Sequence, residues 1–202
     1  MDNVVTKTGT TTVGLTTADG VVLAADRRAS LGGRFVSNKN AVKIERVHPT
    51  AAVTMSGSVG GAQAFIRQLR SEADLYENRR GREISVDALA RLAGNLLRGT
   101  PASPILGGVD AEGPRVFNVD GAGGVLEDDY SATGSGMTVA TGALERLYRE
   151  NLSTDEAVDV ASEAVSAASE RDTASGNGIT VARITEDNVN VQSYDEITEA
   201  LP

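Results

Sequence analysis

The sequence GTTTVGLTTADGVVLAAD, residues 9–26, combines two β-type runs with a tight-turn signal between them. Threonine and valine are frequent in these runs, and β-branched residues favour a pleated, half-buried strand. Asp19-Gly20 separates the runs, and Asp-Gly between apolar runs is the strongest short-range signal for a β-hairpin. We therefore predict paired strands at Thr11–Thr17 and Val21–Asp26, around which the remaining elements must be arranged.

The three threonines that follow Gly9 allow a second interpretation. One of these hydroxyls could be a nucleophile that comes to lie at the chain terminus after processing. Threonine-rich strands are common, so these few residues by themselves favour the purely structural interpretation. The rest of the chain has to decide between the two.

Composition limits the class of protein. A chain of 202 residues is expected to form one domain with a sizeable core. The absence of cysteine excludes disulfides, thiolate metal sites and a cysteine nucleophile. A net charge of −9 argues against nucleic acid as a partner. Met1–Gly9 has no apolar run typical of a secretory signal, and no stretch is long enough for a membrane span, so we expect a cytoplasmic protein.

Apolar periodicity predicts the other elements. Helical stripes occur at residues 62–76, 88–97 and 139–148, and a fourth helix begins at Ser153, where Glu156 completes a capping box. Further strands are predicted at 43–47, 51–56, 105–110, 115–120, 125–130, 179–185 and 189–193. Strands and helix pairs therefore alternate along the chain. Two stacked antiparallel sheets with a helix pair outside each would bury every apolar face, which predicts an α+β, four-layer αββα sandwich.

Residues that could carry chemistry are scattered along the chain. The sequence contains no GxxxxGK[ST], HExxH or GxSxG motif. Its one histidine, His48, precedes a proline between two predicted strands, and we expect a solvated turn residue there. Asp26 ends a strand, Lys43 is one of only three lysines among 19 basic residues, and residues 55–60 join a strand to a helix through glycines. Backbone N–H groups in such a loop can face an anion.

Taken together, these pieces closely resemble the proteasome β subunits of the archaeal type. The matching segments are Gly-Thr-Thr-Thr-Val-Gly at 9–14, Ala-Ala-Asp-Arg-Arg at 24–28, Asn-Ala-Val-Lys-Ile at 40–44, Ser-Gly-Ser-Val-Gly at 56–60, Gly-Gly-Val-Asp at 107–110, Ser-Ala-Thr-Gly-Ser-Gly at 131–136 and Arg-Asp-Thr-Ala-Ser-Gly at 171–176. The resemblance extends from Gly9 to about Ser193 and implies the same αββα sandwich, the fold of N-terminal-nucleophile (Ntn) hydrolases. One departure is Gly32-Gly33-Arg34, which lengthens a loop by about one residue.

The resemblance implies an N-terminal threonine protease whose nucleophile is Thr10. Residues 1–9 would be a propeptide that the chain removes by cutting Gly9-Thr10, leaving 10–202 as a single catalytic domain. The new α-amino group, with a reference pKa of about 7.7–8.0, could then take the proton from the Thr10 hydroxyl. Lys43, paired with Asp26, would either stay charged and stabilise the oxygen or act as the base itself if its pKa is lowered.

The resemblance also assigns the rest of the site. Gly57 would donate its N–H to the oxyanion, which typically contributes about 3 kcal/mol to the transition state. Ser135, Asp172 and Ser175 would orient the Thr10 amine. A mainly apolar pocket for the residue before the cut would be lined by Ala29, Ser30, Ala41, Glu45, Met55 and Val59. No cofactor or metal is implied.

Three functional hypotheses follow. The first is a proteasome β subunit in heptameric rings, stacked between rings of α subunits, that degrades unfolded proteins delivered by a regulatory ATPase. An α subunit is disfavoured because the N-terminal extension typical of that class is missing. The second hypothesis keeps the N-terminal nucleophile but makes the substrate a small amide. The third is a structural β subunit that fills the ring without cutting, although its catalytic set would then be expected to be broken.

Overall fold

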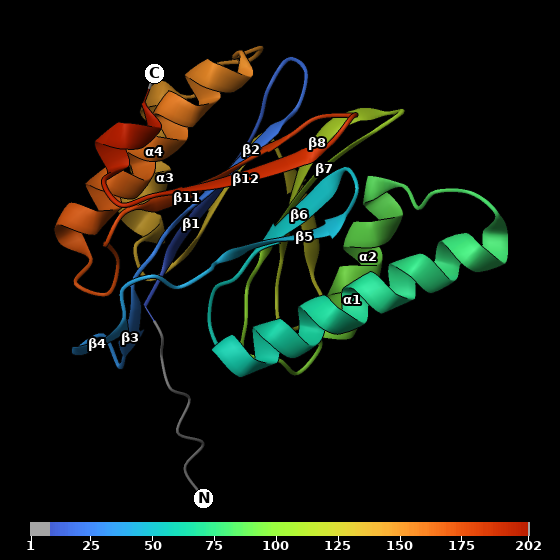
Figure 1. The fold of residues 1–202 in the computed structure, drawn as a ribbon, viewed down its shortest axis with the longest axis horizontal. Coiled ribbons are helices and arrows are strands. Elements are labelled where there is room, and N and C mark those ends of the chain that lie inside the picture. Colours follow the sequence, from blue (N-terminus) through green and yellow to red (C-terminus); the bar gives the residue numbers. More distant parts are fainter. Residues whose placement is uncertain (1–8, 202) are drawn as a thin grey trace, which may run out of the picture.

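Two five-stranded antiparallel sheets lie face to face within residues 9–201, the part of the chain that the computed structural model describes (Figure 1). The first sheet has the order β10–β1–β2–β11–β12, and the second has the order β5–β6–β7–β8–β9. The first consists of β1 (Thr11–Thr16), β2 (Val21–Asp26), β10 (Tyr130–Gly134), β11 (Ile179–Ile184) and β12 (Val189–Tyr194). The second consists of β5 (Ile44–His48), β6 (Ala51–Thr54), β7 (Ile105–Asp110), β8 (Gly113–Val119) and β9 (Val125–Asp128).

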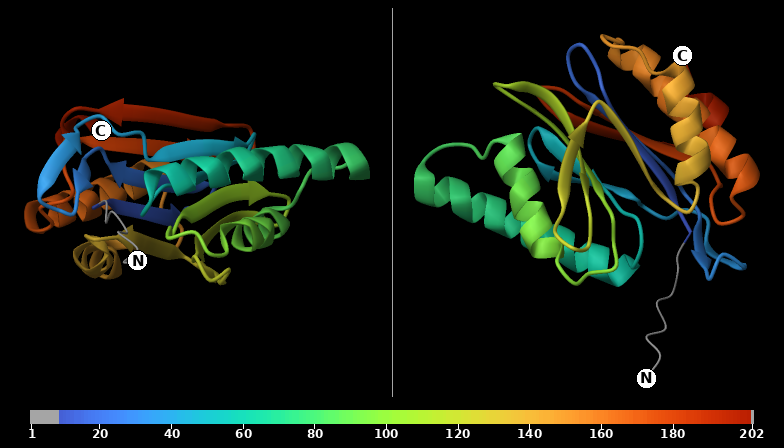
Figure 2. Two further views of the ribbon diagram at one scale, coloured as in Figure 1. Left: turned by 90° about the horizontal axis from the view of Figure 1, so that it is seen from below. Right: turned by 180° about the vertical axis from the view of Figure 1, so that it is seen from behind.

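A helix pair covers the outer face of each sheet, as Figure 2 shows from two further directions. Helices α1 (Val59–Arg80) and α2 (Val86–Leu97) pack on the second sheet, and α3 (Met137–Leu147) and α4 (Thr154–Arg171) pack on the first. A third apolar cluster, which includes Leu23 and Ile105, fills the space between the sheets. The predicted α+β, four-layer αββα sandwich is confirmed.

The hairpin of β1 and β2 forms as its sequence predicts. The two strands are antiparallel and pair from Thr12 opposite Ala25 to Thr16 opposite Val21. Alternation sends Val13 toward α3 and α4, whereas Leu23 points toward the second sheet. Helices α3 and α4 cover one face of β1 and β2 and the second sheet covers the other, so both faces are buried and the end of β2 is held in a fixed position.

The helix termini also follow sequence signals. Ser58 and Ser85 cap the N-termini of α1 and α2, each accepting a hydrogen bond from a backbone N–H three residues later. Ser153 and Glu156 form the predicted capping box of α4. Among residues 9–201, no helix combines the length and the apolar character needed to cross a bilayer.

Two local predictions are wrong, and two short elements were not predicted. The single strand expected at 125–130 is two strands, because the chain crosses at Asp129 from β9 in one sheet to β10 in the other. Residues 29–38, for which no strand was predicted, form a short hairpin of β3 (Ala29–Leu31) and β4 (Phe35–Asn38), and a short 3₁₀ helix, η1 (Ile197–Ala200), lies near the end of the described chain. His48 is buried at the end of β5, where its Nε2 lies 2.9 Å from Oε1 of Glu77 on α1.

Candidate active site

Thr10 lies directly before β1 on the wall of a cavity of about 430 Å³. The hydroxyls of the next two threonines are already engaged: Thr11 Oγ1 lies 2.8 Å from Ser175 Oγ, and Thr12 Oγ1 lies 2.8 Å from Thr133 Oγ1. Thr10 instead lines the cavity. The structure thus separates one threonine that faces the cavity from two that hold the strand.

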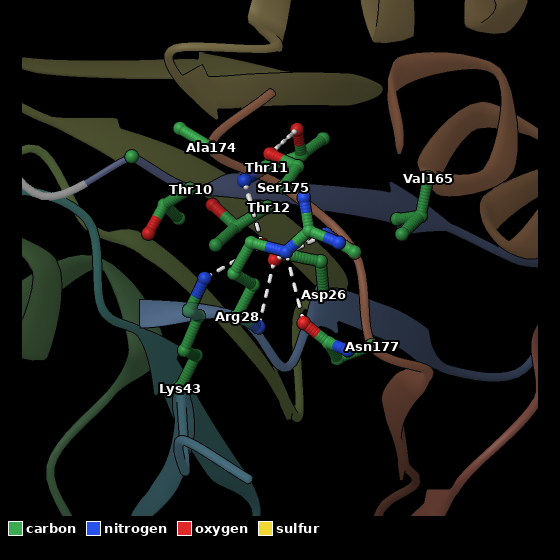
Figure 3. Close-up of polar contacts among 12 residues, drawn as sticks. Thr10, Thr11, Thr12, Asp26, Arg28, Lys43, Val165, Ala174, Ser175 and Asn177 are labelled. Atoms are coloured by element: carbon green, nitrogen blue, oxygen red, sulfur yellow. Dashed lines mark hydrogen bonds and ion pairs between the residues drawn. The ribbon is translucent and has the colours of Figure 1, made fainter. Parts of the chain in front are cut away.

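A buried ion pair lies beside Thr10, as Figure 3 shows. Asp26 ends β2, Lys43 immediately precedes β5, and Lys43 Nζ lies 2.7 Å from Asp26 Oδ1. The Lys43 side chain is 6% exposed and that of Asp26 is fully buried. Asp26 also accepts hydrogen bonds from the backbone N–H groups of Thr11 and Gly176, each at 2.9 Å. These contacts fix the carboxylate between the start of β1 and the segment before β11.

Burial lowers the pKa of Lys43 from its ordinary value, while the neighbouring Asp26 carboxylate opposes that shift. Desolvation disfavours the ammonium form, so the neutral amine is easier to reach than in water. Both roles considered for Lys43 therefore stay chemically available. The Asp26 contact favours the charged ammonium, whereas burial favours loss of its proton.

A chain of hydroxyl and carboxylate groups approaches the Thr10 nitrogen from another direction. The Thr10 N–H donates to Ser135 Oγ at 3.0 Å, and Ser135 Oγ donates to Asp172 Oδ2 at 2.5 Å. Ser175 Oγ donates to the same Asp172 oxygen at 2.7 Å and therefore accepts from Thr11 Oγ1. We call Ser135, Asp172 and Ser175 the hydroxyl chain. It places a carboxylate one hydroxyl away from the Thr10 nitrogen.

Gly57 lies across the cavity in the segment between β6 and α1. Its φ of +101° is a backbone conformation that favours glycine. It forms an isolated β-bridge with Ala102, which fixes the loop against the segment that follows α2. Gly57 lines the cavity wall, and its oxyanion role stays a prediction.

Most residues of the expected substrate pocket do line the cavity: Ala29, Ala41, Glu45, Met55 and Val59. Ser30 is buried behind it and accepts a hydrogen bond from the Gly9 N–H at 3.1 Å. The Glu45 carboxylate is paired with Arg70 at 2.6 Å, which offsets its charge at the cavity rim.

Other cavity residues were not identified from the sequence. They are Ser37, Asn38, Asn40, Val42, Ala62 and Gln63. Several belong to β4 or to the segment between β4 and β5, and the unpredicted β3–β4 hairpin brings them to the cavity. Among residues 9–201, no cluster of three or more histidine, aspartate or glutamate side chains could hold a metal ion.

The fold and site together define an Ntn-hydrolase sandwich with a threonine at the head of its first strand. The proteasome subunit family matches residues 6–184, and the chain belongs to this family. It is 63% identical over 200 residues to proteasome subunit beta of Halorhabdus utahensis, covering 98% of this chain and 86% of that protein. It is 61% identical over 202 residues to proteasome subunit beta 2 of Haloarcula marismortui, covering 98% and 87%. It is 58% identical over 204 residues to the Natronomonas pharaonis subunit, covering 100% and 85%.

Proposed function

We propose that the chain is the catalytic β subunit of a proteasome core particle and that it hydrolyses peptide bonds with Thr10 as an N-terminal nucleophile. The curated relatives are named proteasome subunit beta and match this chain along nearly its whole length. The observation that carries the catalytic part is the position of Thr10, which lines the cavity next to the buried Asp26–Lys43 ion pair. The heptameric rings, the α subunits and the ATPase are part of this proposal.

Release of the Thr10 amine is the first step of the proposed mechanism. The Thr10 Oγ attacks the Gly9 carbonyl carbon and its proton passes to Lys43 or a bound water. The Gly9–Thr10 C–N bond then breaks as the nitrogen gains a proton, and water hydrolyses the resulting ester. Only a glycine fits at position 9 in this conformation, because a Cβ there would overlap the Ala174 side chain. The absence of a side chain also leaves the Gly9 carbonyl unshielded. Residues 1–8 of the proposed leader lie outside the described residues.

In the mature subunit the Thr10 nitrogen becomes an amine with a reference pKa of about 7.7–8.0. It can take the hydroxyl proton as Thr10 attacks a substrate carbonyl, and later return a proton to the leaving amine. Ser135 holds this nitrogen, and Asp172 orients Ser135. Gly57 stabilises the oxyanion. The Asp26–Lys43 pair supplies positive charge at the Thr10 oxygen or, through the lowered Lys43 pKa, a second base.

The cavity supports a preference for large apolar residues before the cut. Met55 contributes an apolar wall, and the small side chains of Ala29 and Ala41 leave space in front of it. The Glu45–Arg70 pair leaves little net charge at the rim. Peptide substrates ending in leucine or tyrosine should therefore be cleaved faster than one ending in glutamate. Equal rates for the acidic and apolar peptides would contradict this preference.

One experiment distinguishes the proposed peptidase from the two alternatives, a small-amide hydrolase and a structural subunit without activity. Purified particles are treated with a covalent probe for N-terminal threonine and assayed with fluorogenic peptides and with a panel of small amides. Labelling of Thr10 with peptide hydrolysis supports the proposal. Labelling with hydrolysis of small amides alone would indicate an amidase, and the absence of both labelling and turnover would indicate a structural subunit.

A further inference from the structure

The segment 173–178, between α4 and β11, has an unusual backbone. It directly follows Asp172 and contains Ser175, so its conformation affects two of the three members of the hydroxyl chain. The φ angles of Gly176, Asn177 and Gly178 are +143°, +64° and +87°. A non-glycine residue in the left-handed region persists only where surrounding contacts hold it. Asparagine enters this region more readily than other non-glycine residues, and contacts from outside the segment would stabilise the conformation further.

Arg28 provides contacts of this kind. Its Nε donates to Asn177 Oδ1 at 2.9 Å, and its Nη1 donates to the Thr173 carbonyl at 2.9 Å. These two hydrogen bonds hold the segment on both sides of Ser175. The guanidinium also lies so close to Gly176 that a Cβ there would come within 2.6 Å of Nη2. Figure 3 draws the contact between Arg28 and Asn177 as a dashed line beside Asp26.

The backbone of Arg28 joins the same residue to the ion pair. Its N–H donates to Asp26 Oδ2 at 3.0 Å, the carboxylate oxygen that also accepts the Gly176 N–H at 2.9 Å. Arg28 thus contacts both the Asp26–Lys43 pair and the segment that carries Ser175. The side chain of Arg27, its neighbour in sequence, instead pairs with Asp195 at 2.6 Å and donates to Asn40 Oδ1 at 3.1 Å.

We propose that Arg28 is a positioning residue for the peptidase reaction: its guanidinium locks segment 173–178 so that Asp172 and Ser175 can align Ser135 and the Thr10 nitrogen. Arg28 does not line the cavity and has no role in binding the substrate side chain. This inference rests on the proposed function, since it concerns the alignment of the Thr10 amine.

The test compares variants in assembled particles, with kcat expressed per Thr10 amine counted by the N-terminal threonine probe. Arg28→Ala should lower kcat by about five- to tenfold, which is the loss expected when the Ser135 contact to the Thr10 nitrogen is no longer aligned, and leave KM nearly unchanged. The kcat of Arg28→Lys should lie between those of wild type and Arg28→Ala, because lysine keeps the charge but lacks the planar guanidinium that donates to two partners. Arg146→Ala, at an exposed position on α3, is the control and should keep its kcat.

Asn177→Gly provides an independent variant, since glycine adopts the same backbone conformation and only the Oδ1 acceptor is lost. It should lower kcat in the same direction. The double variant with Arg28→Ala should lose less than the product of the two single losses, because both changes remove the same hydrogen bond. This coupling would not arise if Arg28 only contributed general stability.

Each result has a distinct meaning. Wild-type kcat in Arg28→Ala particles would overturn the inference while leaving the proposed function intact. Equal losses in the Arg146→Ala and Arg28→Ala variants, with equal drops in melting temperature, would also overturn it. If Arg28→Ala does not assemble, the Arg28→Lys and Asn177→Gly variants decide the question by the same kcat and KM measurements. Wild-type particles that hydrolyse no peptide would instead refute the proposed function, and this inference with it.

Discussion

The buried ion pair and the hydroxyl chain both reach Thr10, yet they are built differently. Asp26 and Lys43 lie at strand ends and are almost fully buried; backbone N–H groups fix the Asp26 carboxylate, and Asp26 in turn holds Lys43. Ser135 is exposed and Asp172 half-buried, and both lie in segments between elements. We propose that the two groups have different roles: the buried ion pair sets the charge at the Thr10 oxygen, and the hydroxyl chain orients the Thr10 nitrogen.

The largest expected effect in this comparison comes from the ion pair. Lys43→Arg should lower peptide hydrolysis by about 10³-fold, within the range typical of general acid–base groups, while ring assembly persists. The wider guanidinium does not fit a buried site whose ammonium lies 2.7 Å from Asp26. Steady-state kinetics on assembled particles measure the loss. Lys39→Arg, at an exposed position, is the matched control, and near wild-type turnover in Lys43→Arg would remove Lys43 from the mechanism.

The carboxylate of the hydroxyl chain should matter less. Asp172→Asn retains the size of the side chain but removes its negative charge. The hydroxyls of Ser135 and Ser175, which both donate to Asp172 Oδ2, would then face either the NH₂ group or a neutral amide oxygen. We expect about a 10²-fold loss in kcat, at the lower end for a group of this kind. Glu170→Gln removes a nearby exposed charge and should have no such effect. A loss as large as that of Lys43→Arg would contradict the proposed difference in roles.

Ser135→Ala should have a smaller effect again. The variant removes the acceptor of the Thr10 N–H, and one such hydrogen bond contributes about 1 kcal/mol, or roughly five- to tenfold in rate. Because Ser135 is exposed, water can replace part of the contact. Intact mass should show whether leader removal slows in parallel with turnover. A loss of a thousandfold would mean that the hydroxyl is itself essential to proton transfer.

The smallest expected effect is on the pH dependence of stability. Burial lowers the pKa of Lys43 below its unfolded value of about 10.4, so the unfolded chain binds more protons between the two values. The contribution of Lys43 to stability therefore rises with pH across that window and is unfavourable below it. Melting temperatures of wild type and Ser135→Ala should both show this alkaline component relative to Lys43→Met. Parallel curves for all three proteins would exclude it.

The sequence was sufficient to place the central strands, the four helices and the ends at which Asp26 and Lys43 meet, because local periodicity and the matching segments mark them. It did not reveal that the chain crosses from β9 in the second sheet to β10 in the first, because the pairing of Thr11 with Gly134 joins distant parts of the chain. The β3–β4 hairpin is short and mostly exposed, so it carries little apolar pattern. Arg28 was missed for a related reason: its partners, at Thr173 and Asn177, lie far along the chain.

Thr10 itself tests the central claim most directly. Intact-mass measurement on assembled particles should show wild-type chains that begin at Thr10, and Thr10→Ala chains that retain residues 1–9 and hydrolyse no peptide. Thr10→Ser keeps a hydroxyl, so it should be processed and retain part of the activity. Wild-type chains that keep their leader and still hydrolyse peptides, or Thr10→Ala chains that are processed in particles without active neighbours, would contradict the N-terminal-nucleophile mechanism.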